Sequence, residues 1–298
     1  MVDEKILSKI THIPEAQLIA EFLMLQKRTA QISSWLKEVK EDDRVHGYVN
    51  SNGAVTGRMT HSNPNMAQIP SVTADYGKEC RACWTVPKGY KLVGIDASQL
   101  ELRMLAHYMN DEDYINEIIN GDIHSTNQKL AGLKSRDQAK TFIYALIYGA
   151  ANKKLGTVAG GSGELGKKLR ESFFNNLPSF RNLATRVERS SSKGYIKGVD
   201  GRKLIIRRKH AALNTLLQGA GAVVMKQGLI IFNDYIKQDM EELFGRMDKD
   251  NSGSLERAEV ILFMKALSDD LSDDHIHMIF DSLDEDGSNS IELEEFMV

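Results

Sequence analysis

Oxygen-bearing side chains recur at fixed positions in a twelve-residue segment that begins at Asp248. The candidate ligands at positions 1, 3, 5, 7, 9 and 12 are Asp248, Asp250, Ser252, Ser254, Glu256 and Glu259. Alternating side-chain oxygens and one backbone carbonyl can wrap a calcium ion, and a glycine at position 6, here Gly253, permits the sharp turn. The final Glu closes the coordination sphere with both of its oxygens. The spacing therefore predicts a Ca²⁺ site.

A second segment with the same spacing begins 36 residues later. Its candidate calcium ligands are Asp284, Asp286, Ser288, Ser290, Glu292 and Glu295. Asn289 replaces the glycine of position 6, and Asn tolerates a left-handed backbone better than most residues. Both segments match the EF-hand motif, in which the residues at position 8, here Leu255 and Ile291, pair the two loops through a short strand contact. The alternative is an acidic, solvated surface.

A different chemistry is indicated by four residues at four-residue steps: Arg136, Lys140, Tyr144 and Tyr148. In a helix this spacing places two cations and then two aromatic rings on one face. Such a face suits a nucleoside triphosphate, because cations bind phosphates and rings stack on a base or sugar. Taken alone, a stripe of this kind is more often a partly buried helix face.

The charge of the chain separates these two chemistries. From Asp239 onward there are 18 Asp and Glu against 4 Lys and Arg, a net charge of -14, whereas the whole chain carries only -3 and the remainder therefore +11. A basic part suits a polyanion such as nucleic acid, and a dense carboxylate cluster suits a hard cation. We therefore predict two domains, 1–238 and 239–298.

Hydrophobic periodicity predicts the elements that position these residues. Apolar residues at helical spacing predict one or two helices over Pro14–Lys40, and further helices over Leu100–Asn110 and Ser135–Tyr148. The apolar run Lys91–Ile95 is typical of a buried strand that presents Asp96 at its tip.

Turn residues and a second long apolar pattern complete this prediction. Gly, Asn and Pro predict loop and short strand over Gly47–Pro70, and Asp200-Gly201 predicts a hairpin between two basic strands. His210–Lys237 is apolar at helical spacing and runs on to Met247 without a Pro, so the two domains are expected to join within one helix.

Cysteine usage and hydropathy indicate the compartment. Cys80 and Cys83 form a C-x-x-C, which could bind zinc or act in redox chemistry, but two small buried residues followed by strand and turn at Trp84–Pro87 are the simpler interpretation. Two cysteines in a chain of 298 residues fit a reducing compartment. The N-terminus lacks a signal-peptide core, and no stretch approaches about 18 uninterrupted apolar residues. We expect a soluble, intracellular protein with no membrane partner.

Five segments occur in a fixed order along the basic part. They are Thr56–Pro70 (TGRMTHSNPNMAQIP), Asp96–Arg103 (DASQLELR), Asp122–His124 (DIH), Arg136–Gly149 and His210–Gln218 (HAALNTLLQ). Their order and residue sequences resemble those of the family A DNA polymerases, most closely the podophage enzymes, over roughly Pro14 to Asp234. The resemblance implies an α+β, helix-rich fold: a partial polymerase palm and fingers followed by an all-α EF-hand pair.

The same resemblance implies roles at a polymerase active site. Asp96 would be the first catalytic carboxylate and bind Mg²⁺, with the carbonyl of Ala97 as a further ligand, and Glu101 would pack against the sugar edge and exclude ribose. The residues that would hold the incoming deoxynucleoside triphosphate or the template base are His124, Arg136, Lys140, Tyr144 and Tyr148.

Contacts to a DNA primer-template are implied for five more residues: Arg58, Asn65, Gln68, Asn214 and Gln218. These contacts would lie largely in the minor groove, whose degenerate pattern suits an enzyme that must accept every sequence. Simple packing is the alternative for Asn65, Gln68 and Asn214.

One part of a polymerase site has no match. Nucleotidyl transfer by two metal ions needs two fixed carboxylates, and Asp96 supplies only one. In the family the second follows a His downstream of the Gln218 helix, but none of the eight histidines here is followed by Asp. We therefore expect little polymerase activity from the chain as it stands.

Three hypotheses remain open. The chain is a family A DNA polymerase fragment, or a calcium-binding module attached to a DNA-binding remnant that lacks catalytic activity, or a fusion of two unrelated genes without a joint function. Primer extension in magnesium tests the first hypothesis, and calcium titration tests the second.

Overall fold

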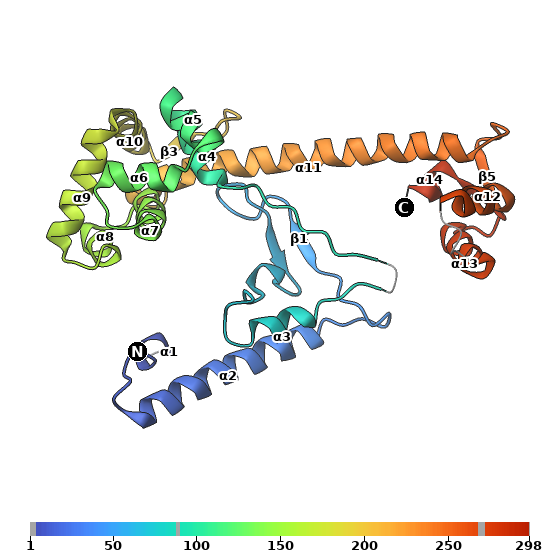
Figure 1. The fold of residues 1–298 in the computed structure, drawn as a ribbon, viewed down its shortest axis with the longest axis horizontal. Coiled ribbons are helices and arrows are strands. Elements are labelled where there is room, and N and C mark those ends of the chain that lie inside the picture. The colour runs from blue at the N-terminus through green and yellow to red at the C-terminus, as the bar shows by residue number, and fades with distance from the viewer. Residues whose placement is uncertain (1–3, 88–89, 268–271, 298) are drawn as a thin grey trace. The chain divides into compact units, whose positions relative to one another are not determined.

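The computed structural model describes residues 4–87, 90–267 and 272–297. It divides into two compact units, the N-terminal unit Met1–Val223 and the C-terminal unit Val224–Val298, and each is described by itself. Helices dominate both units, and the described strands form three two-stranded antiparallel sheets (Figure 1). The helix-rich α+β prediction is confirmed.

The elements follow one another along the chain with short connections. The helices of the N-terminal unit are α1 (Glu4–Leu7), α2 (Pro14–Leu36), α3 (Gly77–Ala82), α4 (Leu100–Met109), α5 (Glu112–Asn120), α6 (Ile123–Ala131), α7 (Arg136–Ile147), α8 (Asn152–Val158), α9 (Gly163–Asn176) and α10 (Pro178–Ser191), with the 3₁₀ turns η1 (Met66–Gln68) and η2 (Lys209–Ala211). Its strands are β1 (Tyr48–Asn50), β2 (Thr60–Ser62), β3 (Tyr195–Lys197) and β4 (Lys203–Ile205). Helix α11 (Ala212–Met247) continues into the C-terminal unit, which adds β5 (Ser254–Glu256), α12 (Arg257–Leu267), α13 (Asp273–Leu283), β6 (Ser290–Glu292) and α14 (Leu293–Phe296).

Local sequence signals place several of these boundaries. Helices α5, α6 and α7 each begin at a capping side chain, Asp111, Asp122 and Ser135, which accepts a hydrogen bond from a backbone N–H of the first turn. The predicted helices at α4 and α7, the β3–β4 hairpin and the single long helix α11 are confirmed. The predicted domain boundary at 238/239 stays a prediction; the two units divide at 223/224, also within α11.

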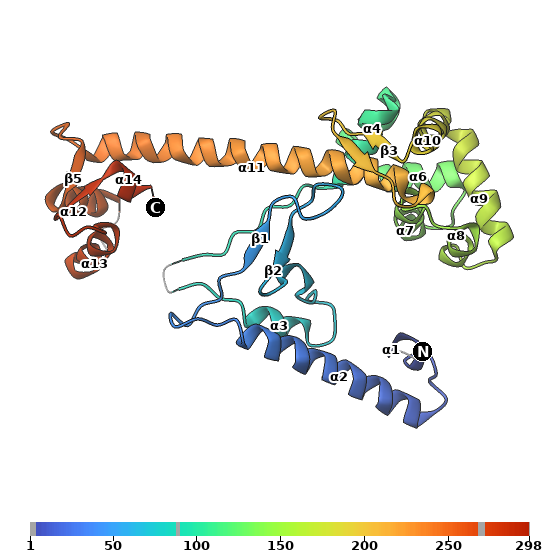
Figure 2. The ribbon, with the colours of Figure 1, turned by 180° about the vertical axis from the view of Figure 1, so that it is seen from behind.

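The core of the N-terminal unit forms around α7, α9 and α10, which lie together in both ribbon views (Figure 2). Phe173 meets Phe142 and Phe180 edge-to-face, with ring centroids 6.2 and 5.2 Å apart. All three rings are buried. Burial of such large side chains stabilises the unit by roughly 1.5–3 kcal/mol each, so α7 is held firmly and its outward face keeps a defined position.

The segment that leads to Asp96 differs from its prediction. Lys91–Ile95 is not a strand, and Leu92, Val93 and Ile95 are 77%, 77% and 73% exposed. A strand needs a neighbour that accepts and donates its backbone hydrogen bonds, and none of the described sheets includes this segment. An apolar sequence pattern therefore predicted a strand for which the described chain holds no partner.

The region around the two cysteines is also different from expectation. Cys80 is buried on α3, but Cys83 is exposed, so the pair are not both core residues. Trp84–Pro87 has no regular secondary structure. Instead, Trp84 packs edge-to-face on Trp35 of α2, with ring centroids 5.4 Å apart. This contact joins the segment after α3 to the end of α2.

The C-terminal unit has its own small core, made of buried residues from α11, α12, α13 and the two short strands. Leu255 of β5 and Ile291 of β6 are partners in the antiparallel ladder, and both are fully buried. The predicted pairing of the two loops is confirmed. Phe244 of α11 and Phe296 of α14 close the core with ring centroids 5.6 Å apart.

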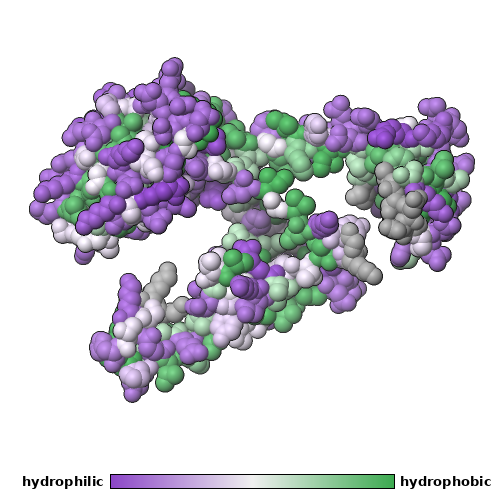
Figure 3. Space-filling view, viewed as in Figure 1, coloured by the Kyte–Doolittle hydropathy of each residue, from purple (hydrophilic) through white to green (hydrophobic). Residues whose placement is uncertain are grey.

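An apolar stripe lies on α11 before the EF-hand core (Figure 3). Its exposed members include Leu229, Ile231, Phe232 and Tyr235. By length and composition, residues 209–247 form one helix that could cross a membrane. The core helices of soluble proteins meet the same criterion, so this property alone does not assign α11 to a membrane.

Candidate nucleotide, DNA and metal sites

Helix α7 presents the predicted stripe of two cations and two rings. Arg136 is tied to Asp122 at the start of α6 by two hydrogen bonds, Nε to Oδ2 at 2.7 Å and the second terminal nitrogen to Oδ1 at 3.1 Å. The Arg136 guanidinium holds the pKa of Asp122 well below its usual range, with the Ser125 hydroxyl as a second donor. Lys140, one turn further, is exposed, and its side chain has no hydrogen bond or ion pair within the described chain.

His124 lies beside this pair at the start of α6. Its side chain is only 4% exposed, and its ring Nδ1 is buried without a hydrogen-bond partner among the described residues. Burial, and then the Arg136 charge, lower the pKa of His124, so the neutral ring is favoured. The ring lies 6.5 Å from that of Tyr144. A buried nitrogen without a partner beside a cation is suited to a ligand oxygen.

The aromatic end of the stripe meets three of the other predicted residues. The rings of Tyr144 and Tyr148 are 6.3 Å apart, and the Tyr148 hydroxyl donates to Oε1 of Glu101 on α4 at 3.4 Å. Burial, and then the Glu101 carboxylate, raise the pKa of Tyr148, while Arg58 and Gln218 act in the opposite direction. The structure therefore brings Arg58, Glu101, Tyr148 and Gln218 together.

A glycine makes this arrangement possible. Gly149 follows α7 with φ of 73°, and a Cβ there would collide with the carbonyl oxygen of His210 in η2. The close approach sets the end of α7 against the start of α11, which carries Asn214 and Gln218. The side-chain oxygen of Asn214 is buried without a partner in the described structure, so it is available to a ligand.

Asp96 and Ala97 lie apart from any metal cluster that the described residues form. Asp96 is exposed, and its side chain has no hydrogen bond or ion pair in the described chain. The clusters of three or more potential metal ligands found among the described residues are both in the C-terminal unit. Asp96 therefore belongs to no group of three potential metal ligands in the described part of the chain.

The remaining predicted DNA contacts are on a surface loop. Asn65 precedes η1, Gln68 is its last residue, and both are exposed. The Gln68 carbonyl accepts from Gln31 of α2 at 2.8 Å. Arg202 of the β3–β4 turn donates to the Thr56 carbonyl at 3.3 Å. The loop before Arg58 is thus anchored to the hairpin by an arginine that the sequence analysis did not single out.

The first EF-hand loop brings three carboxylates together. Ligand atoms of Asp248, Asp250 and Glu259 lie within 4.8 Å of one another. Both Glu259 oxygens accept backbone hydrogen bonds, from Lys249 at 2.7 Å and from Glu256 at 3.1 Å, which hold the carboxylate at the loop. Gly253 has φ of 84°, as the sharp turn requires. The donor set fits a hard cation.

The second loop repeats this geometry. Ligand atoms of Asp284, Asp286 and Glu295 also lie within 4.8 Å of one another. Asn289 adopts the left-handed conformation expected of position 6, with φ of 63°. Its side-chain oxygen accepts from Arg257 of the first loop at 3.0 Å. The residue that departs from the motif therefore ties one loop to the other.

Two residues of these sites were missed in the sequence. Asp122 was noticed only as part of a motif, yet it both caps α6 and binds Arg136. The sequence signal that could have found this residue is an Asp at the position directly before a helix. Arg257 pairs with Asp281 at 2.7 Å and lies over the Phe280 ring at 4.1 Å, in addition to its bond to Asn289. Nothing in the local sequence marks that role, because its partners come from α13 and the second loop.

Comparisons with known proteins match both parts of the chain. The model of DNA polymerase family A matches residues 1–247, and that of the EF-hand domain pair matches residues 237–297. The DNA-directed DNA polymerases of Enterobacteria phage T3 and Escherichia phage T7 are each 45% identical over 77% of this chain. The chain spans only 38% of the length of these two relatives.

A solved structure shares the fold. The POL domain of Pol1 from M. smegmatis, in complex with DNA primer-template and dNTP, aligns with a TM-score of 0.68 and 26% identity. The alignment covers 79% of this chain and 45% of that one. The predicted family resemblance and the EF-hand pair are both confirmed.

Proposed function

This chain belongs to DNA polymerase family A, and we propose that its N-terminal unit binds a deoxynucleoside triphosphate and a DNA primer-template. The observation that carries the proposal is the α7 face, where Arg136 and Lys140 precede two tyrosine rings and the unpaired nitrogen of His124 lies alongside. Cations and a polar ring would bind the phosphates, and Tyr144 would stack near the sugar and base.

Arg136 is not free to bind phosphate in this arrangement. Its guanidinium is engaged by Asp122, so triphosphate binding would replace one anion by another. Lys140 has no such competitor among the described residues. Lys140 therefore makes the first contact with the phosphates in this proposal, and Arg136 follows.

Titration with dTTP in magnesium tests nucleotide binding. Lys140→Gln is expected to weaken binding roughly tenfold, because a hydrogen bond to a charged group contributes about 1.5–3 kcal/mol. Lys154→Gln on α8 removes an exposed lysine outside this face and serves as the matched control. Equal affinity of the two variants would exclude the α7 face.

The DNA surface is tested in the same way with a labelled primer-template. Arg58, Asn65, Gln68, Asn214 and Gln218 are the proposed contacts. Arg58→Gln is expected to reduce the affinity and to lower the salt dependence of log K by about one unit, as loss of one phosphate contact does. Unchanged affinity and salt slope would remove Arg58 from the DNA surface.

Nucleotidyl transfer by this chain is a separate question. Asp96, with the carbonyl of Ala97, would hold one Mg²⁺ ion, and Glu101 would exclude ribose, but no His-Asp pair that would supply the second carboxylate occurs in the sequence. We therefore propose binding without efficient turnover. Primer extension that is abolished by Asp96→Ala would contradict this part of the proposal and restore the polymerase hypothesis.

We further propose that the C-terminal unit binds Ca²⁺ through its two loops. The two preformed carboxylate clusters carry this proposal, because hard cations take oxygen ligands in this arrangement. The wild-type chain is expected to bind two ions, and Glu259→Gln is expected to lose the first. Glu241→Gln, which changes an exposed Glu of α11 outside the loops, is the control. Absence of binding below millimolar Ca²⁺ would reject the proposal.

A further inference from the structure

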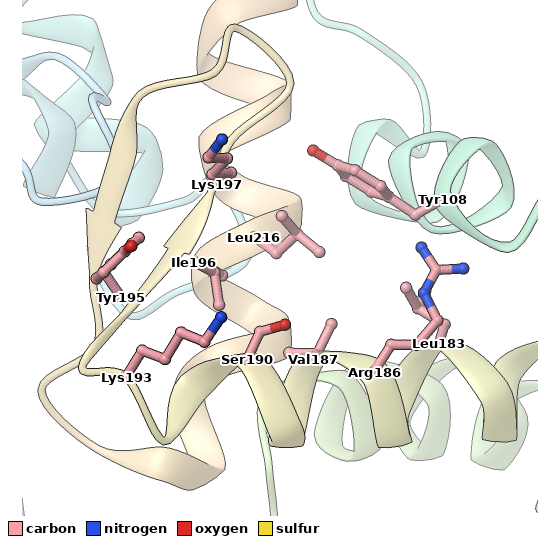
Figure 4. A pocket seen from close by; sticks show the side chains of 10 residues that line it. All are labelled: Tyr108, Leu183, Arg186, Val187, Ser190, Lys193, Tyr195, Ile196, Lys197 and Leu216. Carbon is pink, nitrogen blue, oxygen red and sulfur yellow. The ribbon is translucent and has the colours of Figure 1, made fainter.

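A cavity that is separate from the α7 face lies in the N-terminal unit between α4, α10 and the β3–β4 hairpin (Figure 4). Its volume is about 310 Å³, the size at which cavities begin to hold small molecules. Buried apolar side chains form its floor, among them Val187, Ile196 and Leu216. None of the residues assigned above to nucleotide, DNA or metal lines it.

The polar lining of this cavity is cationic. Arg186 and Lys193 come from α10 and the turn after it, and Lys197 comes from β3. No carboxylate pairs with any of the three in the described structure. The nearby Asp200 pairs with Arg202 instead, whose Nε lies 3.0 Å from its Oδ2. Three uncompensated cations around one hollow create a local field that attracts an anion.

The Tyr108 hydroxyl is a second, independent observation that points to a ligand in this cavity. The Tyr108 oxygen is buried and has no hydrogen-bond partner among the described residues. An unsatisfied buried polar group costs free energy that a bound oxygen or nitrogen recovers. Burial, and then the Asp200 charge, raise the pKa of Tyr108, so the hydroxyl keeps its proton and can donate it to an acceptor.

The shape of the lining narrows the kind of anion. Figure 4 shows the Arg186 guanidinium rising from α10 toward the Tyr108 ring, while the Lys193 amine points toward Ser190. The cationic groups therefore surround a floor of aliphatic side chains beside a tyrosine ring. A bare inorganic anion would leave that apolar surface unused, whereas a phosphate joined to a flat ring system would use both.

We propose that this cavity binds a nucleotide, with its phosphate at the cationic rim to which Arg186, Lys193 and Lys197 belong and its base over the apolar floor. The nucleotide is either free or part of a single strand, since both present the same chemistry. This inference goes beyond the proposed function, because the cavity and the α7 face share no residue.

The test compares two serines of the same turn. Ser190 lines the cavity and Ser192 does not, and both are exposed. Ser190→Glu places a negative charge among the three cations and is expected to weaken binding of a labelled octamer of thymidylate by tenfold or more. Ser192→Glu makes the same charge change outside the cavity and is expected to alter the affinity by less than threefold. Equal loss in both variants would overturn the proposal.

Three further measurements complete the test. Tyr108→Phe removes only the hydroxyl and is expected to weaken octamer binding several-fold without lowering the thermal stability of the unbound protein. Lys140→Gln removes a cation of the α7 face and is expected to leave octamer binding intact, which separates this site from the proposed triphosphate site. A titration with dTMP identifies the source: affinity equal to that of the octamer and equally lost in Ser190→Glu indicates a free nucleotide, and weaker binding indicates a strand.

One outcome assigns the cavity to another class of ligand. A glutamate-rich peptide that binds the wild type and is lost in Ser190→Glu, when neither nucleotide probe binds, would overturn the nucleotide proposal.

Discussion

The carboxylates of the C-terminal loops and the carboxylate of Asp96 are held in opposite ways. Glu259 accepts two backbone hydrogen bonds from its own loop, and the strand beside it is paired and buried. Asp96 follows an apolar segment that is exposed and unpaired. The comparison teaches that local sequence alone brings together a carboxylate cluster within twelve residues, whereas a carboxylate at the tip of a strand depends on partners from elsewhere in the chain.

The largest expected effect contrasts two isoleucines. Ile291 is fully buried in β6, and Ile95 is 73% exposed. Ile291→Ala is expected to destabilise the C-terminal unit by about 2–5 kcal/mol, because it removes buried methyl groups and leaves a cavity. Ile95→Ala is expected to change stability by less than about 0.5 kcal/mol. Hydrogen exchange of the β5–β6 amides in urea measures the stability of the C-terminal unit in Ile291→Ala.

Tryptophan fluorescence measures the stability of the N-terminal unit in Ile95→Ala, because Trp35 and Trp84 are the only tryptophans and both belong to that unit. A cost at Ile95 as large as that at Ile291 would mean that the Lys91–Ile95 segment is packed in solution, and the contrast between the two regions would disappear.

Calcium is expected to increase the difference in stability between the two units. If both loops bind Ca²⁺, a concentration one hundred times the dissociation constant of a site stabilises the C-terminal unit by about 2.7 kcal/mol per site. The N-terminal unit is expected to gain nothing. Thermal unfolding with and without calcium, followed by tryptophan fluorescence for the N-terminal unit and by hydrogen exchange for the C-terminal unit, separates the two. Equal stabilisation of both would indicate calcium binding outside the loops.

A smaller effect is expected at the link between the loops. Arg257→Ala removes the bond to Asn289, the ion pair with Asp281 and the contact with the Phe280 ring. We expect a loss of about 1–2 kcal/mol, observed as weaker calcium binding at the second loop. Arg246→Ala on α11 removes an exposed arginine without described partners and is the control. If the two variants bind calcium alike, the loops are independent.

The smallest effect concerns Asp122, a carboxylate that the N-terminal unit holds in an ion pair with Arg136. The pKa of Asp122 is lowered by Arg136, so the pair contributes stability above the unfolded pKa, near 3.9. That contribution is lost as the pH falls through the lower folded pKa. The melting temperature of Asp122→Asn should therefore lie below that of the wild type at pH 7, and the difference should shrink only below about pH 4.

A difference that vanished between pH 7 and pH 5 would mean that another group controls the pair. Asn keeps the capping oxygen of α6, so this substitution isolates the charge.

The sequence correctly predicted those elements that are specified by their own local residues. Helices α4 and α7 follow from apolar periodicity, and the β3–β4 hairpin follows from Asp200-Gly201. The strand at Lys91–Ile95 was wrong because periodicity records a preference for burial and says nothing about whether a partner is present. Cys83 was placed in the core for a similar reason, although its neighbour Cys80 is buried.

What the sequence determined by itself was thus the local chemistry: two twelve-residue loops whose ligands, turn residues and pairing position are all close along the chain. The tertiary structure decided which side chains meet across long separations. It set Arg136 on Asp122, Tyr148 on Glu101 and Arg257 on Asn289. The physical reason is that a loop's geometry is encoded in neighbouring backbone angles, whereas a contact between distant residues exists only after the core has placed their helices.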